Sequence, residues 1–363
     1  MATTPPKNTG LYANEEGKVV IHDLPFPEPE EGELLIKVLY SGVNLSDVRS
    51  LEFFGLKNYA LGGEFCGEVL DSPTLASTPY KAGDRVAGLV VGGIGRHWRF
   101  ATHKEYLTAH ADWVFKVPDH MPPQAAASLT VVVQTASNTL YNHFHLPLPP
   151  SVAKGTRDEG AAAPEGTLVV WGGATGVGMA AIQLARGSRV SSIIAIASTQ
   201  RHEFLKSLGA TQCFDYRDPD VVKNVKSALQ GTKGTIWGFD ALGTIENPVS
   251  QEILKSAIPP HDNVRLATVL LAPHEGFEPI VGSRQFDLDL DLPDGTKLFW
   301  PKDEAATERH WKGFRWVIDN YGGEYKPTPI RVFDGPGEDA VKELSNMWNM
   351  NNFGKLVLKF PFY

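Results

Sequence analysis

A glycine-rich run between residues 172 and 178 is the stretch whose residue types and spacing point to a definite chemistry. It follows a segment typical of a strand, residues 167–171, and leads into one typical of a helix, residues 174–186. Glycines in such a turn let the backbone approach a pyrophosphate, which the first N–H groups of the helix bind. The turn can also merely connect two elements, but the strand–helix units downstream favour a dinucleotide site. Its expected lining is Gly173, Ala174, Thr175, Gly176, Val177 and Gly178.

The end of the next predicted strand indicates which dinucleotide the site prefers. NAD sites usually carry an acidic residue there, which binds the ribose 2′-hydroxyl. This sequence has Ser198, Thr199, Gln200 and Arg201, with no acid at the tip of the strand. The serine and the arginine can bind a 2′-phosphate through charge-assisted hydrogen bonds, and Tyr216 can form a wall of that pocket. We therefore predict NADPH; the alternative is that Arg201 is a surface residue at a helix start.

Only a parallel sheet can bring these residues together, and the second half of the sequence has the pattern of one. Short β-branched segments alternate with helical segments, which predicts βαβ units and a doubly wound sheet. The predicted strands are residues 167–171, 192–197, 213–216, 235–240 and 264–271, and the predicted helices 174–186, 200–208, 221–229 and 251–258. A hairpin is predicted at residues 286–292 and 297–300, and a further helix at 310–320.

The first part of the chain has a different pattern, with short β segments punctuated by glycine and proline. Strands are predicted at residues 18–22, 34–40, 64–70, 85–90 and 113–117, which indicates a compact β domain. Residues 122–145 can be helical, and residues 146–166, rich in Pro, Ala and Gly, are predicted to form an exposed, flexible loop. Two late strands, residues 330–333 and 355–360, are expected to return to the first domain.

Length and composition restrict the number of domains, the partners and the kinds of site that this sequence can have. The chain has 363 residues, which favours two domains, and a net charge of −8, which argues against nucleic acid or an anionic membrane as the main partner. No apolar run is long enough to span a membrane, and residues 1–9 lack an apolar signal-peptide core. The two cysteines, Cys66 and Cys213, are too few for a disulfide framework or a cysteine-built zinc site. We expect a cytoplasmic protein.

Three features together resemble the medium-chain dehydrogenases/reductases. They are the β-rich N-terminal region with its Gly-Asp-Arg-Val at residues 83–86, the glycine-rich turn, and the return strand near the C-terminus. The resemblance covers nearly the whole chain. It implies an α/β protein with a β-rich GroES-like catalytic domain, residues 1–128 and 306–363, and a doubly wound Rossmann domain that binds NADPH, residues 129–305.

Zinc-dependent members of that superfamily carry a cysteine and a histidine as metal ligands in two short motifs. The matching stretches here are residues 42–47 and 62–64, with Asn44 at the position of the cysteine and Gly63 at that of the histidine. Because neither residue can replace a thiolate or an imidazole on zinc, we expect no metal. The remaining histidines show no ligand spacing, and we expect loop or surface positions for His97, His103 and His110.

The match is instead to the zinc-free quinone oxidoreductase and enoyl reductase branch. It looks closest to fungal enoyl reductases that act in trans with polyketide synthases (lovastatin type), through residues 43–49, 146–150 and 213–217. Arg49 in place of a lysine and Leu45 in place of a proline depart from the pattern. The resemblance implies further cofactor contacts at Ser46, Asp47, Val48, Arg49, Thr135, Leu242, Gly243, Val269, Leu270, Phe353 and Gly354.

The resemblance implies hydride transfer from NADPH to the double bond of an enoyl thioester or enone, in secondary-metabolite biosynthesis. Its partner would be the acyl carrier domain of a polyketide synthase. Asn44 and Arg49 can polarise the carbonyl oxygen, and Tyr59 can donate the proton, for which water and the cofactor's own 2′-hydroxyl are alternatives. Two other interpretations are a free-standing quinone or alkenal reductase and an NADPH-binding protein with little turnover.

Overall fold

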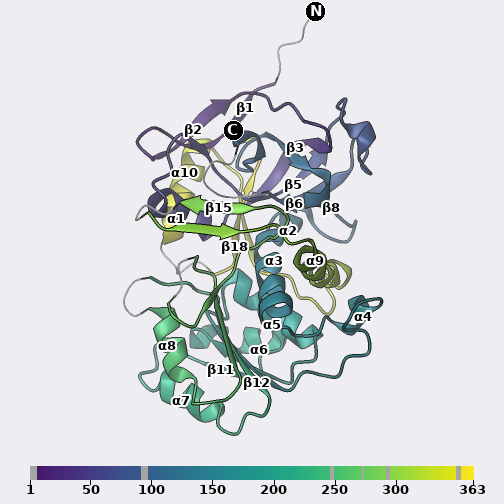
Figure 1. The fold of residues 1–363 in the computed structure, drawn as a ribbon. Helices are drawn as coiled ribbons and strands as arrows, with labels where there is room; N and C mark the ends of the chain where they lie inside the picture. Colours follow the sequence, from purple (N-terminus) through teal and green to yellow (C-terminus); the bar gives the residue numbers. More distant parts are fainter. Residues whose placement is uncertain (1–5, 91–96, 246–248, 272–273, 292–294, 349–352) are drawn as a thin grey trace, which may run out of the picture. The chain divides into compact units, whose positions relative to one another are not determined.

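The computed structural model describes residues 6–90, 97–245, 249–271, 274–291, 295–348 and 353–363. They form two compact units (Figure 1). The first contains Met1–Val131, Gln285–Lys302 and Thr328–Tyr363, and the second contains Val132–Arg284 and Asp303–Pro327. This division differs from the predicted one in three places: residues 129–131 and 285–302 group with the first unit, and residues 306–327 with the second.

The first unit is built on a β-sheet in the order β17–β18–β3–β5–β6–β8, with β7 paired to β3, and on a smaller sheet in the order β2–β1–β4. The predicted strands are all present, within a few residues, as β2, β3, β5, β6 and β8. Strands β1, β4 and β7 escaped prediction because they are short or carry Asn, Gly and His. The bounds are β1 (Asn8–Ala13), β2 (Val19–Leu24), β3 (Glu33–Gly42), β4 (Tyr59–Ala60), β5 (Glu64–Val69), β6 (Arg85–Leu89), β7 (Tyr106–His110), β8 (Val114–Lys116), β17 (Ile330–Phe333) and β18 (Lys355–Lys359).

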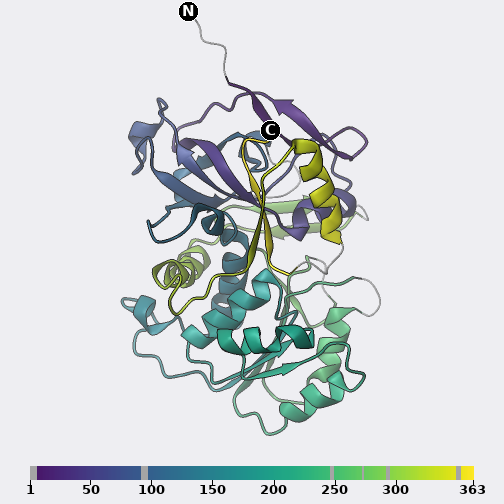
Figure 2. The same cartoon turned by 180° about the vertical axis from the view of Figure 1, so that it is seen from behind.

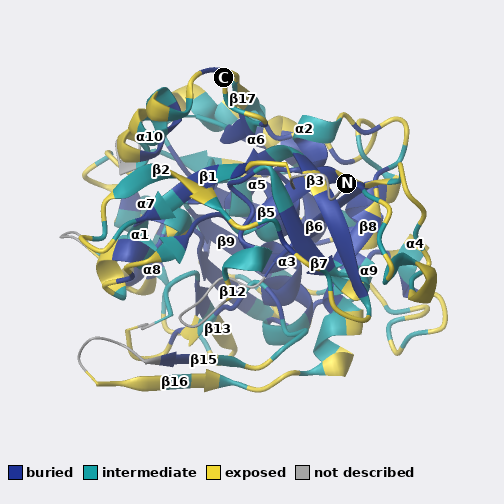
Figure 3. Cartoon of the chain, turned by 90° about the horizontal axis from the view of Figure 1, so that it is seen from above, coloured by how far each residue is buried: buried dark blue, intermediate teal, exposed yellow. Residues whose placement is uncertain are grey.

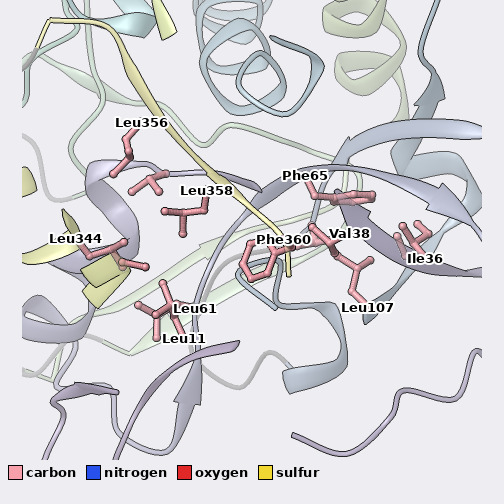
Figure 4. Close-up of a cluster of buried hydrophobic side chains, with 14 of the residues drawn as sticks. Leu11, Ile36, Val38, Leu61, Phe65, Leu107, Leu344, Leu356, Leu358 and Phe360 are labelled. Carbon is pink, nitrogen blue, oxygen red and sulfur yellow. The ribbon is translucent and has the colours of Figure 1, made fainter. Parts of the chain in front are cut away.

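Alternate side chains of these strands meet in one hydrophobic core, because successive residues of a strand point to opposite faces. Figure 4 shows ten of its members: Leu11, Ile36, Val38, Leu61, Phe65, Leu107, Leu344, Leu356, Leu358 and Phe360. The tail returns to this unit as predicted, since β18 pairs antiparallel with β3, with Val357 opposite Gly42. Helix α10 (Gly337–Ser345) lies in the same C-terminal segment, drawn in yellow in Figure 2.

Asn44 occupies the junction between β3 and helix α1 (Leu45–Phe53), which was not predicted. The Asp47 carboxylate accepts a hydrogen bond from the backbone N–H of Asn44 at 2.7 Å and so stabilises the start of the helix. Just before it, a side chain at Gly42 would place its Cβ 2.2 Å from the carbonyl oxygen of Ala127. Residue 127 can therefore approach the end of β3 this closely only because residue 42 has no side chain.

The second unit contains a six-stranded sheet in the order β11–β10–β9–β12–β13–β14, with every neighbouring pair parallel. This is the doubly wound arrangement that the alternation of strands and helices predicts. Its strands are β9 (Gly166–Trp171), β10 (Ser192–Ile196), β11 (Gln212–Phe214), β12 (Thr235–Asp240), β13 (Val264–Thr268) and β14 (Glu278–Pro279). All but the short β14 were predicted, within a few residues.

Helices pack against this sheet. Val169, Ile194 and Ile236 pack against Val225 of α7 and Leu254 of α8, while α5 and α6 contact β9, β10 and β11. Strands β9, β10 and β12 are accordingly buried except for their first residues. Exposed residues lie in loops, on helix surfaces and on strands such as β16 (Figure 3). The helices of the chain besides α1 and α10 are α2 (Pro123–Ala126), α3 (Thr130–Asn138), a π-helical turn (Thr139–His143), α4 (Pro150–Ala153), α5 (Gly176–Gly187), α6 (His202–Leu208), α7 (Val221–Ala228), α8 (Ser250–Ala257) and α9 (Glu304–Asp319). Short 3₁₀ turns lie at Leu75–Ser77, Trp98–Phe100, Ala111–Trp113, Thr199–Arg201 and Asn346–Trp348.

Residues 146–166 are not the wholly exposed loop that their composition predicts. Leu146 and Leu148 are buried, and the Asp158 carboxylate accepts the backbone N–H of Leu148 at 3.0 Å. The same carboxylate pairs with Arg309 of α9 at 2.6 Å, and Arg309 also donates to the carbonyl oxygen of Leu146. The first half of the segment is therefore held by a long-range ion pair that its own composition does not reveal.

The hairpin and the last long helix explain the division into units. β15 (Leu288–Asp291) pairs antiparallel with β16 (Lys297–Trp300), and nearby Phe286 packs edge-on against Trp113 of the first unit. Helix α9 instead packs in the second unit, where the hydroxyl of Ser137 donates to the carbonyl oxygen of His310 at 2.7 Å. No helix in the described part of the chain is long and apolar enough to cross a bilayer.

The buried His310 makes the stability of the protein sensitive to acid. Burial lowers the pKa of its imidazole from 6.5 to about 4, so the unfolded chain binds a proton at a higher pH than the folded chain. We expect the contribution of this group to be fully present above pH 6.5 and to be lost as the pH falls towards 4, by about 3 kcal/mol. In urea unfolding, His310→Asn should remove this part of the pH dependence, and His120→Asn, at an exposed position, should not. Equal pH dependence in both variants would contradict the assignment.

Candidate functional site

Four parallel strands of the second unit end at the same edge of its sheet, namely β9, β10, β12 and β13. The strand order reverses at β9, which has β10 on one side and β12 on the other. Ligands of doubly wound sheets bind at such a switch point, outside the carboxyl ends of the strands. The loops at residues 172–178, 197–201, 241–245 and 269–271 follow these ends, so the structure gathers most of the predicted cofactor residues of this unit.

Close packing requires the glycines of the first loop. Gly172 has a φ of +81°, and a side chain at Gly178 would place its Cβ 2.3 Å from the carbonyl oxygen of Gly172. A backbone oxygen cannot move aside, so α5 begins this close to β9 only with glycine at position 178. The turn presents backbone without bulky side chains at the N-terminus of a 12-residue helix. This arrangement fits a pyrophosphate.

Thr175 caps α5 and connects the glycine turn to the loop after β12. Its Oγ1 accepts a hydrogen bond from the backbone N–H of Gly178 at 3.0 Å and donates one to the carbonyl oxygen of Ala241 at 3.1 Å. The hydroxyl is thus used within the protein. The backbone N–H of Thr175 is also used within the protein, since it donates to the carbonyl oxygen of Gly172 at 2.9 Å.

Asp240, which the sequence analysis did not select, organises the loop after β12. Its carboxylate accepts the backbone N–H groups of Leu242 at 3.2 Å and Gly243 at 3.1 Å, and the hydroxyls of Ser250 and Thr268, both at 2.9 Å. Burial raises the pKa of Asp240, and these hydrogen bonds oppose the rise. One carboxylate therefore connects the end of β12, the start of α8 and the end of β13.

The predicted nicotinamide-side residues lie together as a consequence. Gly243 has a φ of +64°, and a Cβ there would lie 2.9 Å from Val269 and 3.2 Å from Leu270. Leu242, Val269 and Leu270 are all partly exposed. Thr135 of α3 is 8% exposed. The loops after β12 and β13 thus form one surface at the switch point.

The tip of β10 contains a charged group that the sequence analysis missed. The Asp215 carboxylate, from the segment after β11, accepts the backbone N–H of Thr199 at 2.9 Å and its hydroxyl at 2.6 Å. Arg217 binds the same carboxylate at 2.6 Å and holds the pKa of Asp215 well below its usual range. The next strand therefore supplies an acid that β10 itself lacks, and an arginine compensates its charge.

The other residues predicted to bind a 2′-phosphate surround this pair. Ser198 and Arg201 are partly exposed, and Gln200 is exposed. Tyr216 is 54% exposed, and the guanidinium of Arg217 lies 5.5 Å from the centre of its ring. The tip of β10 is accordingly accessible. Arg201 lies in the 3₁₀ turn before α6, and Arg217 lies over the ring of Tyr216.

In the first unit, a buried ionic cluster surrounds Asn44. The Lys355 ammonium lies 2.5 Å from Oε1 of Glu64 and donates to Oδ1 of Asn44 at 2.6 Å. The Asn44 amide nitrogen donates to the same Glu64 oxygen at 3.0 Å, and Oε2 of Glu64 accepts the backbone N–H of Val131 at 2.8 Å. Local spacing did not suggest this cluster, because 311 residues separate Asn44 from Lys355.

Among the described residues, no group of three or more His, Cys, Asp or Glu side chains is placed to hold a metal ion. Around the position where zinc-type sequences carry their ligands, the structure has the amide of Asn44, the carboxylate of Glu64 and the ammonium of Lys355. An ammonium is a donor without a lone pair and cannot ligate zinc.

His103 lies in a loop, as one of the two predicted positions has it, but it is fully buried and not at the surface. Its Nδ1 contacts Oγ of Ser41 at 2.8 Å, and its Nε2 lies 3.4 Å from Oδ2 of Asp47. The Ser41 hydroxyl donates to the carbonyl oxygen of Glu64 at 2.8 Å. His103 therefore supports α1 and β5 from inside the domain, a role visible only when β3, β5 and residue 103 are brought together.

The remaining predicted residues of the first unit differ in their environments. Ser46 is exposed, whereas the side chain of Val48 lies in the core, so Val48 has only its backbone for a ligand. Arg49 is partly exposed on α1. Tyr59 lies on β4 and packs against the hydrophobic core. Phe353 is partly exposed. Gly354 has a φ of +95°, and a Cβ there would lie 2.6 Å from the carbonyl oxygen of Pro329.

Comparison with known proteins agrees with this architecture. Residues 30–119 match the alcohol dehydrogenase GroES-like domain family, and residues 176–256 match the zinc-binding dehydrogenase family. The chain is 30% identical to the uncharacterized protein YNL134C of Saccharomyces cerevisiae over 99% of both chains. It is 27% identical to the enoyl reductase cheB of Chaetomium globosum, over 94% of this chain and 90% of that protein.

Two further similarities concern reductases. The chain is 34% identical to the trans-enoyl reductase himH of Aspergillus japonicus, over 54% of this chain and 56% of that protein. The crystal structure of the CurK enoyl reductase shares its fold, with a TM-score of 0.66 and 20% identity over 98% of this chain and 100% of that one. The chain belongs to the medium-chain dehydrogenase/reductase superfamily. It is an oxidoreductase of this superfamily, whose members use a nicotinamide dinucleotide.

Gly178 is the position where a side chain should most directly disrupt the dinucleotide turn. We expect Gly178→Ala to weaken nicotinamide dinucleotide binding at least tenfold, because the added Cβ meets the backbone of Gly172 and displaces the first turn of α5. Gly176→Ala should have a smaller effect, since its Cβ meets only the end of Val132. Gly323→Ala, where the nearest atom lies 3.5 Å away, is the control. Calorimetric affinities with matched thermal melts would measure this, and unchanged affinity in a folded Gly178→Ala protein would disprove the assignment.

Proposed function

We propose that this protein reduces an activated carbon–carbon double bond with NADPH, as an enoyl reductase that acts in trans with a polyketide synthase. The glycine turn at the switch point carries the proposal, because it combines bare backbone, a capped helix start and three neighbouring loops at one sheet edge. The relatives named enoyl reductase and trans-enoyl reductase support the substrate class.

The charges at the tip of β10 support NADPH as the cofactor. The carboxylate of Asp215 is compensated by Arg217 and already accepts two hydrogen bonds from Thr199, so it is not available to a ribose 2′-hydroxyl. Ser198 and Arg201 remain partly exposed beside it and provide a hydroxyl and a cation for a 2′-phosphate. When bound, the reduced nicotinamide supplies a hydride to the β carbon of the substrate.

The protein's own residues would then stabilise charge and deliver a proton. Negative charge accumulates on the substrate's carbonyl oxygen, where a fixed hydrogen-bond donor is most effective. We assign this role to the amide of Asn44, assisted by the cation of Arg49. Tyr59 stays a candidate proton donor to the α carbon; its packing against the core fits a structural role equally. Water or the cofactor's 2′-hydroxyl would serve in its place.

The activity can be measured as NADPH oxidation, monitored by absorbance, with α,β-unsaturated thioesters, enones and quinones tested in parallel. We expect turnover with thioesters, faster when the acyl chain is attached to a carrier domain than when it is free, because the tether raises the effective concentration of the substrate. Faster turnover of small enones or quinones would favour a free-standing reductase. Tight NADPH binding without oxidation by any substrate would favour a binding protein and refute the proposed activity. Gly178→Ala is the inactive control.

Arg201 should decide the preference between the two dinucleotides. We expect Arg201→Ala to weaken NADPH binding by roughly 10- to 100-fold, the loss of one charge-assisted hydrogen bond to a phosphate, and to leave NADH binding nearly unchanged. Lys206→Ala removes a cation from the exposed side of α6 and is the matched control. Fluorescence titrations with both cofactors would measure the ratio. An equal loss for NADPH and NADH would place the 2′-phosphate elsewhere.

A further inference from the structure

We infer that Lys355 is a positioning residue that fixes the side chain of Asn44 with its amide N–H group available to the substrate. This inference rests on the proposed function. Lys355 is 7% exposed and Glu64 is fully buried, and both bind the same asparagine side chain. Lys355 would act through Asn44 and would not itself contact the substrate.

The chemistry of the two partners determines the orientation of the amide. An ammonium has only donors and must face the amide oxygen, and a carboxylate has only acceptors and must face the amide nitrogen. Lys355 donates to Oδ1 of Asn44 at 2.6 Å, and Glu64 accepts from Nδ2 at 3.0 Å. Exchanging the oxygen and the nitrogen would place donor against donor and acceptor against acceptor. The asparagine is therefore held in one of its two orientations.

The clamp leaves one donor available. The amide nitrogen carries two hydrogens, and Glu64 takes one of them. Among the described residues, the contact with Glu64 is the hydrogen bond that this nitrogen donates, and the second hydrogen makes none. Asn44 is 9% exposed, so the group lies at the edge of the core. A preorganised N–H of this kind is suited to an oxygen on which negative charge develops.

The clamp is itself anchored to the fold. Glu64 begins β5 and also accepts the backbone N–H of Val131 in the first turn of α3, where the helix favours a negative charge. The backbone N–H of Lys355 donates to the carbonyl oxygen of Pro329 at 2.8 Å. Three separate stretches of the first unit thus meet at Asn44. A purely structural ion pair would need the two charges but not the asparagine.

A pair of variants separates positioning from charge compensation. Lys355→Met alone leaves the buried Glu64 without its cation and should lower the melting temperature. Adding Glu64→Gln removes both charges, so we expect the double variant to melt near the wild type. We expect its kcat to stay at least tenfold low, with KM and the NADPH dissociation constant within about twofold. The control is Lys359→Met. Lys359 lies on β18 like Lys355, and its ion pair with Asp334 is exposed.

The outcomes are distinct. A double variant with wild-type stability and wild-type kcat would overturn the inference. If the wild type binds NADPH but reduces no substrate, the proposed function fails, and ¹⁵N spectra still test the clamp. The two side-chain amide protons of Asn44, assigned by their loss in Asn44→Ser, should be widely separated in the wild type and close together in the double variant. Identical amide signals in both proteins would disprove the clamp.

Discussion

A carboxylate buried without water must be compensated, and the compensation of Glu64 organises the first unit. Its side chain is inaccessible to solvent, so removal from water has to be offset by an ammonium and by hydrogen bonds. Lys355, the first turn of α3 and the amide of Asn44 supply them. Because these groups come from distant parts of the chain, neutralising one charge also brings β5, Val131 and β18 to the start of α1.

The second unit depends on a different constraint, the common direction of its strands. Parallel strands end at one edge, and reversal of the strand order at β9 separates the helices on either side and leaves room for a ligand. Asp240 then connects the loop after β12, the start of α8 and the end of β13 through four hydrogen bonds. The glycine turn completes the edge because no side chain intervenes between α5 and β9.

In the proposed reduction, an oriented amide of the first unit stands where zinc-type sequences carry a metal ligand. Asn44 and Gly63 lack the donor atoms that zinc prefers, and the neighbouring carboxylate is occupied by a lysine. An oriented amide is a weaker electrophile than a metal ion, and it suits the modest charge that accumulates on a conjugated carbonyl oxygen during hydride addition. The proposed function accordingly assigns substrate polarisation to the protein and the redox chemistry to the cofactor.

The sequence by itself determined what depends on local pattern. Alternating strands and helices predicted a parallel, doubly wound sheet, because periodicity and punctuation are local signals, and the glycine spacing predicted the turn after β9. Residues that act over long distances were decided only by the tertiary structure. Asp215 reaches Thr199 from the next strand, and Lys355 reaches Asn44 across 311 positions. The burial of His103 and of the first half of residues 146–166 follows from partners elsewhere in the chain, since burial and pairing are properties of packed neighbours. Composition reports only what a segment is made of.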